Sequence, residues 1–157
     1  MTKEVMSLID VYQDLHAIPF LYELLRQRNI DMVSLSHRVM PTVYGHIEFY
    51  RSKPYRGWYI IIADRLRVGA VYLTHREEIG VDIRKEDRRK GYGAWAVQEV
   101  MRTHTSSKFL ANINPKNTAS LEMFRSIGFI DFQVTLRYNV AQEISDGADV
   151  RSARTGL

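Results

Sequence analysis

The chain has 157 residues, enough for one domain and too few for two cores of ordinary size. Hydrophobic residues make up 45% of it and charged residues 25%, which is typical of a soluble globular protein. It contains no cysteine, which excludes disulfides, thiolate metal sites and cysteine nucleophiles and suits a cytoplasmic protein. The net charge of +4 favours anionic partners without selecting one.

The longest apolar stretch, residues 58–63, is strand-sized, so we expect neither a membrane-spanning helix nor a membrane partner. The N-terminus has no uninterrupted apolar core, so we expect no signal peptide. Residues 5–12 fit either a strand or the lead-in to a helix. Residues 17–28 place apolar side chains on one face of a helix. Thr42 is suited to cap a second helix that runs to Tyr50.

Three β-rich runs follow, at residues 58–63, 67–74 and 78–83. Asp64-Arg65 and His75-Arg76-Glu77 separate them, and these short linkers predict antiparallel hairpins. The apolar stripe of residues 92–104 then predicts the best-defined helix of the chain.

The last part of the chain predicts a strand at residues 109–113 and a helix that Asn117 caps and Gly128 ends. A final strand is expected over residues 129–140. The whole order indicates an α+β (mixed α/β) fold, a mixed sheet with helices on its faces. We expect one domain over residues 1–140 and a flexible tail over 141–157, which lacks apolar periodicity.

A charged loop, Arg88-Arg-Lys-Gly91-Tyr-Gly93-Ala, joins the third β-rich run to the long helix. Glycines at a helix N-terminus expose backbone N–H groups that attract anions, and pyrophosphate is the usual occupant. A dinucleotide fingerprint would need a third glycine where Ala96 stands, and the Walker sequence is absent. A solvated basic turn and a nucleic-acid patch, interrupted by Glu86-Asp87, stay open as alternatives.

The pattern Arg88-x-x-Gly91-x-Gly93 resembles the Arg/Gln-x-x-Gly-x-Gly/Ala signature of the GNAT superfamily of acetyl-CoA-dependent N-acetyltransferases. Residues 114–129 resemble its second signature: an Asn before a helix, a Ser three residues on, an aromatic residue, then Gly-Phe. The resemblance covers residues 58–138 well. It implies a three-layer GNAT-like fold with a central, mostly antiparallel mixed sheet. This sheet would splay between its fourth strand, residues 78–83, and its fifth strand, residues 109–113.

The resemblance also implies acetyl-CoA as co-substrate and no metal. The fourth strand's backbone would pair with the pantetheine arm, and the loop would hold the pyrophosphate. The residues implied to bind acetyl-CoA are Val81, Asp82, Ile83, Arg88, Arg89, Lys90, Gly91, Tyr92, Gly93, Ala94, Asn114, Asn117, Ser120 and Phe124.

Acyl transfer to an amine needs a base and is helped by an acid. Glu78 is the candidate base, because a carboxylate in the fourth strand could face the cleft; an edge carboxylate paired with Arg76 is the alternative. In many family members a tyrosine at the position of Phe124 serves as the general acid. Phe124 cannot donate a proton and is suited to core packing. Tyr72 and Tyr138 are the remaining candidate acids.

His37, a candidate catalytic residue, and His46 lie near the helices that wall the acceptor pocket in this family; either could instead be a structural hydrogen bonder. Trp58 is a candidate to stack on the acceptor or to pack in the core. We expect the acceptor to be a small-molecule amine such as an amino-sugar nucleotide. A protein N-terminal amine and an amine on a modified nucleobase are alternatives. A non-catalytic acyl-CoA or nucleic-acid binding module is the rival class, and a homodimer is possible.

Overall fold

The computed structural model describes residues 4–28 and 39–138. The elements in chain order are β1 (Met6–Asp10), α1 (Ala17–Gln27), α3 (Val43–Arg51), β2 (Gly57–Ala63), β3 (Leu66–Leu73), β4 (Ile79–Ile83), α4 (Tyr92–Thr103) and α5 (Thr118–Ser126). Short 3₁₀ turns follow β1 and β4. The predicted helices and the three predicted hairpin strands are confirmed with small differences at their ends, and the segment of uncertain type at residues 5–12 contains a strand.

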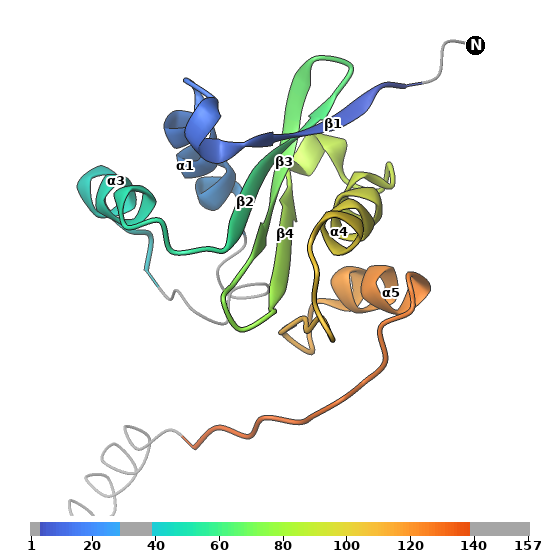
Figure 1. Ribbon diagram of the computed structural model, residues 1–157. Coiled ribbons are helices and arrows are strands. Elements are labelled where there is room, and N and C mark those ends of the chain that lie inside the picture. The colour runs from blue at the N-terminus through green and yellow to red at the C-terminus, as the bar shows by residue number, and fades with distance from the viewer. Residues whose placement is uncertain (1–3, 29–38, 139–157) are drawn as a thin grey trace, which may run out of the picture.

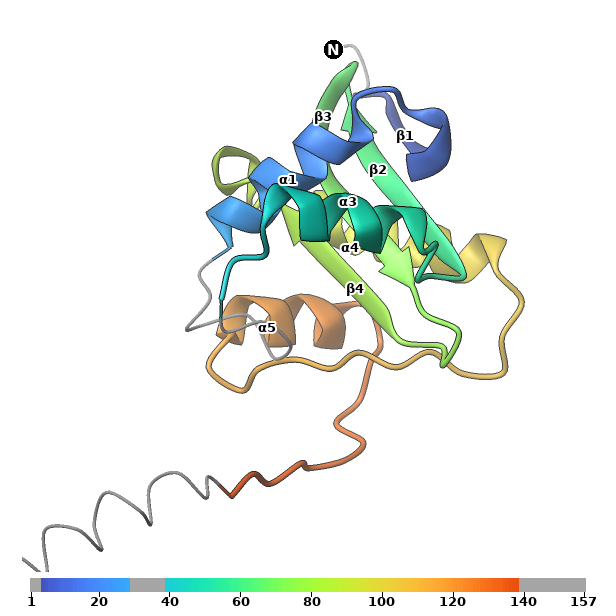
Figure 2. The ribbon, with the colours of Figure 1, turned by 90° about the vertical axis from the view of Figure 1, so that its left-hand side faces the viewer.

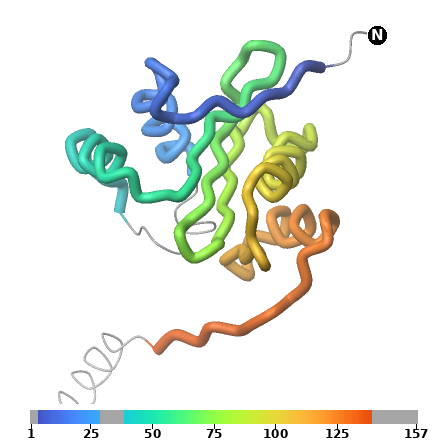
Figure 3. Tube along the Cα trace, viewed as in Figure 1, coloured from blue at the N-terminus to red at the C-terminus, as the bar shows by residue number. Residues whose placement is uncertain are grey.

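The four strands form one antiparallel sheet in the order β1-β2-β3-β4 (Figure 1). α1 and α3 cover one face of this sheet and α4 and α5 the other, as Figures 2 and 3 show from different directions. Side chains alternate along β2: Trp58 and Ile60 pack toward α1, whereas Ile61 and Ala63 pack toward α4. Two cores therefore share one sheet, and the expected three-layer α+β fold is confirmed. No helix in the described ranges is long and apolar enough to span a bilayer.

The strand predicted over residues 109–113 is wrong in its extent. A single parallel bridge joins Glu78 to Leu110, where the Ile79 N–H donates to the Leu110 carbonyl at 2.7 Å. Residues 111–113 form no strand beside β4, because the two segments part after this bridge. The expected splay thus begins at Glu78, with only one bridge before it among the described residues.

The strand predicted over residues 129–140 is wrong for its described part. Residues 129–138 have no regular secondary structure and extend away from the body of the molecule (Figure 1). Alternating apolar residues form a strand only beside a neighbouring strand, and the described segment lies beside none. Residues 139–140 and the predicted flexible tail, 141–157, lie outside the described residues.

Candidate active site

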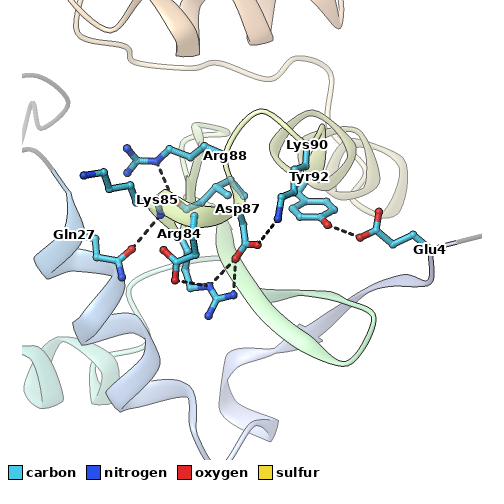
Figure 4. Close-up of polar contacts among 10 residues, drawn as sticks. Glu4, Gln27, Arg84, Lys85, Asp87, Arg88, Lys90 and Tyr92 are labelled. Carbon is cyan, nitrogen blue, oxygen red and sulfur yellow. Dashed lines mark hydrogen bonds and ion pairs between the residues drawn. The ribbon is translucent and has the colours of Figure 1, made fainter.

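The loop between β4 and α4 is held on three sides. The Arg84 N–H donates to the Val68 carbonyl of β3 at 2.8 Å, and Arg88 Nε donates to the Ile83 carbonyl at the end of β4 at 3.1 Å. From the opposite layer, Gln27 Oε1 of α1 accepts from the Lys85 N–H at 3.1 Å (Figure 4). The loop is therefore a shaped part of the fold and does not need a ligand to define its path.

The carboxylate of Asp87 organises the charges of this loop. Asp87 is buried, and it accepts from Arg84 at 2.7 Å and from Lys90 Nζ at 2.9 Å. Burial raises the pKa of Asp87, but the hydrogen bonds from Lys90 and Arg84 outweigh this and hold the pKa below its usual value. Asp87 pairs with Arg84 and Lys90, whereas Lys85, Arg88 and Arg89 are exposed and add outward positive charge to the loop.

The backbone at the start of α4 has the geometry that an anion site needs. Gly91 caps the helix with φ 85°, and Arg89 has φ 64°, so two left-handed residues turn the chain tightly into α4. The first N–H groups of a helix have no partner within it. Gly93 leaves room there: a β-carbon on it would first meet Met123 Sδ at 3.4 Å.

Tyr92 and Ala94, the other two residues at the start of α4, differ in how their side chains are placed. The side chain of Tyr92 turns inward and donates its hydroxyl to Glu4, so only its backbone faces the candidate site (Figure 4). Ala94 is half-buried in the first turn of α4. The structure thus gathers all seven residues of the predicted pyrophosphate loop, 88–94, at one helix N-terminus.

The second motif forms the turn into α5. Asn117 Oδ1 caps the helix by accepting from the Ser120 N–H at 3.2 Å, and Asn114 Oδ1 accepts from the Lys116 N–H at 3.0 Å. Both asparagines shape the backbone across the gap from β4. Phe124 is buried and packs edge-on against Phe129, with ring centroids 5.0 Å apart. Phe124 therefore packs in the core, as its residue type suggested.

Glu78 lies where β4 and the chain at Leu110 part. Its two oxygens accept from Asn112 Nδ2 at 3.1 Å and from Thr74 Oγ1 at 3.3 Å. Arg76 lies 3.8 Å away, so the ion pair foreseen as the alternative is present as well. With 24% of its side chain exposed, Glu78 is held from both edges of the opening and remains within reach of solvent.

Tyr72 lies on the same face of the sheet as Glu78, across from Gly80 in β4. Its ring stacks on Tyr55 with centroids 4.3 Å apart and an angle of 14° between the planes. Burial raises the pKa of Tyr72, which keeps its hydroxyl protonated at neutral pH.

Asp82 forms an ion pair that the sequence did not reveal. The carboxylate of Asp82 lies 2.8 Å from Arg28 at the end of α1, a partner 54 residues away in the chain. Burial raises the pKa of Asp82, and the nearby guanidinium of Arg28 opposes this shift only in part. Asp82 was expected to contribute its backbone; its side chain adds a second carboxylate to the face that carries Glu78.

The two residues predicted to contact the acceptor are both buried. His46 is 5% exposed and shares a hydrogen bond of 3.2 Å between its Nε2 and the Ile18 carbonyl of α1. Burial lowers the pKa of His46, so the ring is neutral at pH 7 and braces α3 against α1. Trp58 lies within an aromatic cluster beneath the same helices. His37 lies outside the described residues.

Taken together, the site offers a backbone anion cradle with two exposed arginines, a parting pair of chain segments, and two carboxylates beside the opening. Within residues 4–28 and 39–138, no three His, Cys, Asp or Glu side chains are grouped to hold a metal ion. This arrangement can bind a phosphorylated, extended molecule along β4 and receive a cation beside Glu78.

Comparison with family models identifies one match: residues 73–138 match the family described as FR47-like protein. The match begins in β3 and includes the loop, α4, the turn at Asn114 and α5. No curated protein matches the chain.

Among solved structures, 77 chains match. A domain from Methanocaldococcus jannaschii DSM 2661 has a TM-score of 0.70 at 19% identity, over 85% of this chain and 92% of that one. Aminoglycoside N-acetyltransferase AAC(6')-Iy, solved in complex with CoA, has a TM-score of 0.62 at 14% identity, over 87% and 94%. An acetyltransferase of the GNAT family from Streptococcus pneumoniae has a TM-score of 0.60 at 14% identity, over 83% and 87%. These similarities confirm the fold that the two motifs implied.

Proposed function

We propose that this chain, a member of the GNAT superfamily, transfers an acetyl group from acetyl-CoA to the primary amine of a small molecule. The observation that carries the proposal is the anion cradle at the N-terminus of α4, placed directly after the strand that parts from its neighbour at Glu78. A pyrophosphate held by the cradle would leave the attached arm free to run between the parted segments. The cradle and the gap thus match the anionic pyrophosphate and the extended pantetheine arm of CoA.

The chain's own groups suit the parts of acetyl-CoA in order. Arg88 and Arg89 would neutralise phosphate oxygens, and the N–H groups of residues 91–94 would donate to the pyrophosphate. The backbone of residues 81–83 would pair with the amides of the pantetheine arm. On the far side of the gap, the turn formed by Asn114 and Asn117 would line the arm or the adenylate, with Ser120 and the packed Phe124 behind it.

The bound co-substrate supplies an activated thioester. The lone pair of the neutral amine attacks the thioester carbonyl, an amide C–N bond forms, the C–S bond breaks, and CoA leaves as thiolate. The amine loses one proton, which Glu78 accepts directly or through one water. Tyr72, protonated at neutral pH, is our candidate to return a proton to the thiolate. A thiol pKa of about 8.5 also lets the thiolate leave without an acid.

We place the acceptor on the α1–α3 side of β4, because both carboxylates, Glu78 and Asp82, lie on that face. Arg28 compensates the charge of Asp82, so Glu78, whose contact with Arg76 is the longer one at 3.8 Å, is the carboxylate that would meet the ammonium group of an acceptor. One of the structural matches is an aminoglycoside N-acetyltransferase, which supports testing amino-sugar acceptors first, amino-sugar nucleotides included. The buried Trp58 and His46 would support the wall of this pocket from beneath.

The test is release of CoA from acetyl-CoA with a panel of amines: amino-sugar nucleotides, aminoglycosides, N-terminal peptides, and nucleosides bearing an amine. We expect turnover on one class of small amine. Glu78→Gln should lower kcat/KM about 100-fold or more, with partial recovery at high pH, where the amine deprotonates itself. Arg88→Ala should raise the KM for acetyl-CoA, whereas Arg102→Ala, an exposed arginine paired with Glu99 on α4, should not.

The outcomes separate the alternatives. Turnover on peptides or nucleosides alone would support the acetyltransferase activity but show that the proposed small-molecule acceptor is wrong. Binding of acetyl-CoA without release on any amine would favour a non-catalytic acyl-CoA binding module. No stabilisation by acetyl-CoA at all would refute the proposal.

A further inference from the structure

Residues 130–137 form an extended segment with two different faces. Its apolar residues alternate with polar ones and are almost fully exposed: Ile130 82%, Phe132 76%, Val134 86% and Leu136 90%. The opposite face carries Asp131, Gln133, Thr135 and Arg137. Four large apolar side chains in regular alternation constitute one half of a β-ribbon, and unpaired strands of this kind readily take up a second strand.

The start of the segment is fixed to α5. The Phe129 N–H donates to the Phe124 carbonyl at 3.1 Å, and the two phenylalanine rings are in contact. Arg125 then binds Asp131 through two hydrogen bonds of 3.0 and 2.8 Å. These contacts direct the chain away from the sheet (Figures 1 and 3). For the segment to turn back onto residues 109–113 of its own chain, the Arg125–Asp131 contact would have to change.

The order of residues is complementary to itself when read in the opposite direction. We propose that two copies of this chain associate by antiparallel pairing of this segment, with Val134 opposite Val134 on the twofold axis. Phe132 then lies opposite Leu136, and Asp131 lies opposite Arg137. Both of these pairs occur twice in the dimer.

This register satisfies charge and packing together. Directly opposite residues of an antiparallel pair point to the same face, so the eight apolar side chains of the two copies meet on one face of the ribbon. Opposite charges meet on the other face, where the two oxygens of Asp131 can serve both Arg125 and the partner's guanidinium. A shift by one residue would place apolar residues opposite charged ones. The proposal concerns assembly and does not depend on the proposed acetyl transfer.

The first test is the mass of the protein in solution, by sedimentation equilibrium over a range of concentrations. We expect a reversible dimer for the natural chain. Val134→Lys places two ammonium groups opposite each other and should weaken the dimer at least about tenfold. Leu15→Lys, at a residue 95% exposed in the turn before α1, is the matched control and should leave the dimer unchanged.

The second test uses the absence of cysteine from the chain to read the register. Opposite Cα atoms in an antiparallel pair lie about 4.5–5.5 Å apart, within the range a disulfide spans. Val134→Cys should therefore cross-link with itself on mild oxidation. Phe132→Cys alone should not, because its two copies would lie about 14 Å apart. A mixture of the Phe132→Cys and Leu136→Cys proteins should cross-link.

Several results would overturn the proposal. A monomer at every concentration, with amide protons of residues 130–137 protected from exchange, would mean that the segment folds onto its own chain. A dimer unaffected by Val134→Lys would lie on another surface. Equal cross-linking of all the cysteine variants would indicate random collision and no defined register.

Discussion

Gly80 lies beneath the ring of Tyr72, and a β-carbon at this position would overlap the ring at Cζ. Gly80→Ala should therefore push Tyr72 off Tyr55 and lower the free energy of unfolding by about 1–3 kcal/mol, the usual cost of overpacking. Denaturant unfolding measures the loss, and near-UV circular dichroism reports on the tyrosine stack. Gly93→Ala is the matched control: its β-carbon meets Met123 at an ordinary contact distance, so the fold should not weaken.

The carboxyl group of Asp87 should make the free energy of unfolding depend on pH. The pKa of its carboxyl is below the usual value in the folded chain, so its contribution to stability is present above the unfolded pKa, near 3.9, and is lost as pH falls through the folded pKa. Asp87→Asn should cost about 2 kcal/mol at pH 7, from the loss of charged hydrogen bonds to Arg84 and Lys90. The difference should disappear in strong acid.

The control for this experiment is Asp131→Asn, because Asp131 is also paired with an arginine but its side chain is 74% exposed. Exposed ion pairs contribute little, so its effect should be a fraction of that of Asp87→Asn in a monomeric sample, measured at low protein concentration. Equal losses at the two sites, or a loss at Asp87 that does not diminish as the pH falls, would show that burial and pairing of Asp87 do not stabilise the loop.

Single residues also mark where sequence reasoning ends. The candidate loop could be identified because its glycines and arginines are adjacent in the chain and their effect is local. The partners of Glu78 and Asp82 could not: Asn112 lies 34 residues from Glu78, and Arg28 lies 54 residues from Asp82. Which of two carboxylates on one strand face meets which cation depends on how the layers pack.

The junction of β4 with α4 depends on left-handed backbone at Gly91, where φ is 85° and a β-carbon would meet nothing within 4 Å. Gly91→Ala should thus cost only conformational strain, about 1 kcal/mol, in the free energy of unfolding. It should also weaken acetyl-CoA binding, because relief of the strain would turn the loop N–H groups away from the phosphates. Thermal unfolding and isothermal titration with acetyl-CoA measure the two effects separately.

Gly128, at the end of α5, is the natural control for Gly91. It has φ 101° and equally open surroundings, so Gly128→Ala should cause a similar loss of stability with no loss of acetyl-CoA affinity. If the two variants lose affinity alike, the effect of Gly91 would be one of general stability and the loop would not be the cofactor site.

Elements differed in how well sequence predicted them for a physical reason. Helices such as α4 depend on local periodicity and capping, which are visible in the chain, and the hairpin strands β2 to β4 are paired with near neighbours. A strand at the edge of a sheet needs a distant neighbour. Residues 109–113 form a single bridge, between Leu110 and Glu78. Residues 130–137 have the alternating sequence of a strand but pair with no neighbouring strand in the described part of the chain.

On the scale of the whole molecule, the two cores are coupled because each buries one face of the same strands. β2 contributes Trp58 and Ile60 to one core and Ile61 and Ala63 to the other. Loss of either core would expose the sheet that the other requires. We therefore expect the described chain to unfold as one cooperative unit, in which binding at the loop stabilises both layers.

This coupling predicts where the domain ends. Among the residues that the structure describes, every buried residue of both cores lies between Val11 and Phe124. We therefore expect a chain that stops after Val140 to melt within about 2 °C of the full chain and to retain acetyl-CoA binding. A chain that stops after Lys116 lacks α5 and the buried Phe124, and loss of such an aromatic alone costs about 3–5 kcal/mol. Differential scanning calorimetry with and without acetyl-CoA compares the three chains. If removal of residues 141–157 lowered the melting temperature as much as removal of α5, the C-terminal segment would belong to the folded domain, and the boundary expected at residue 140 would have to move.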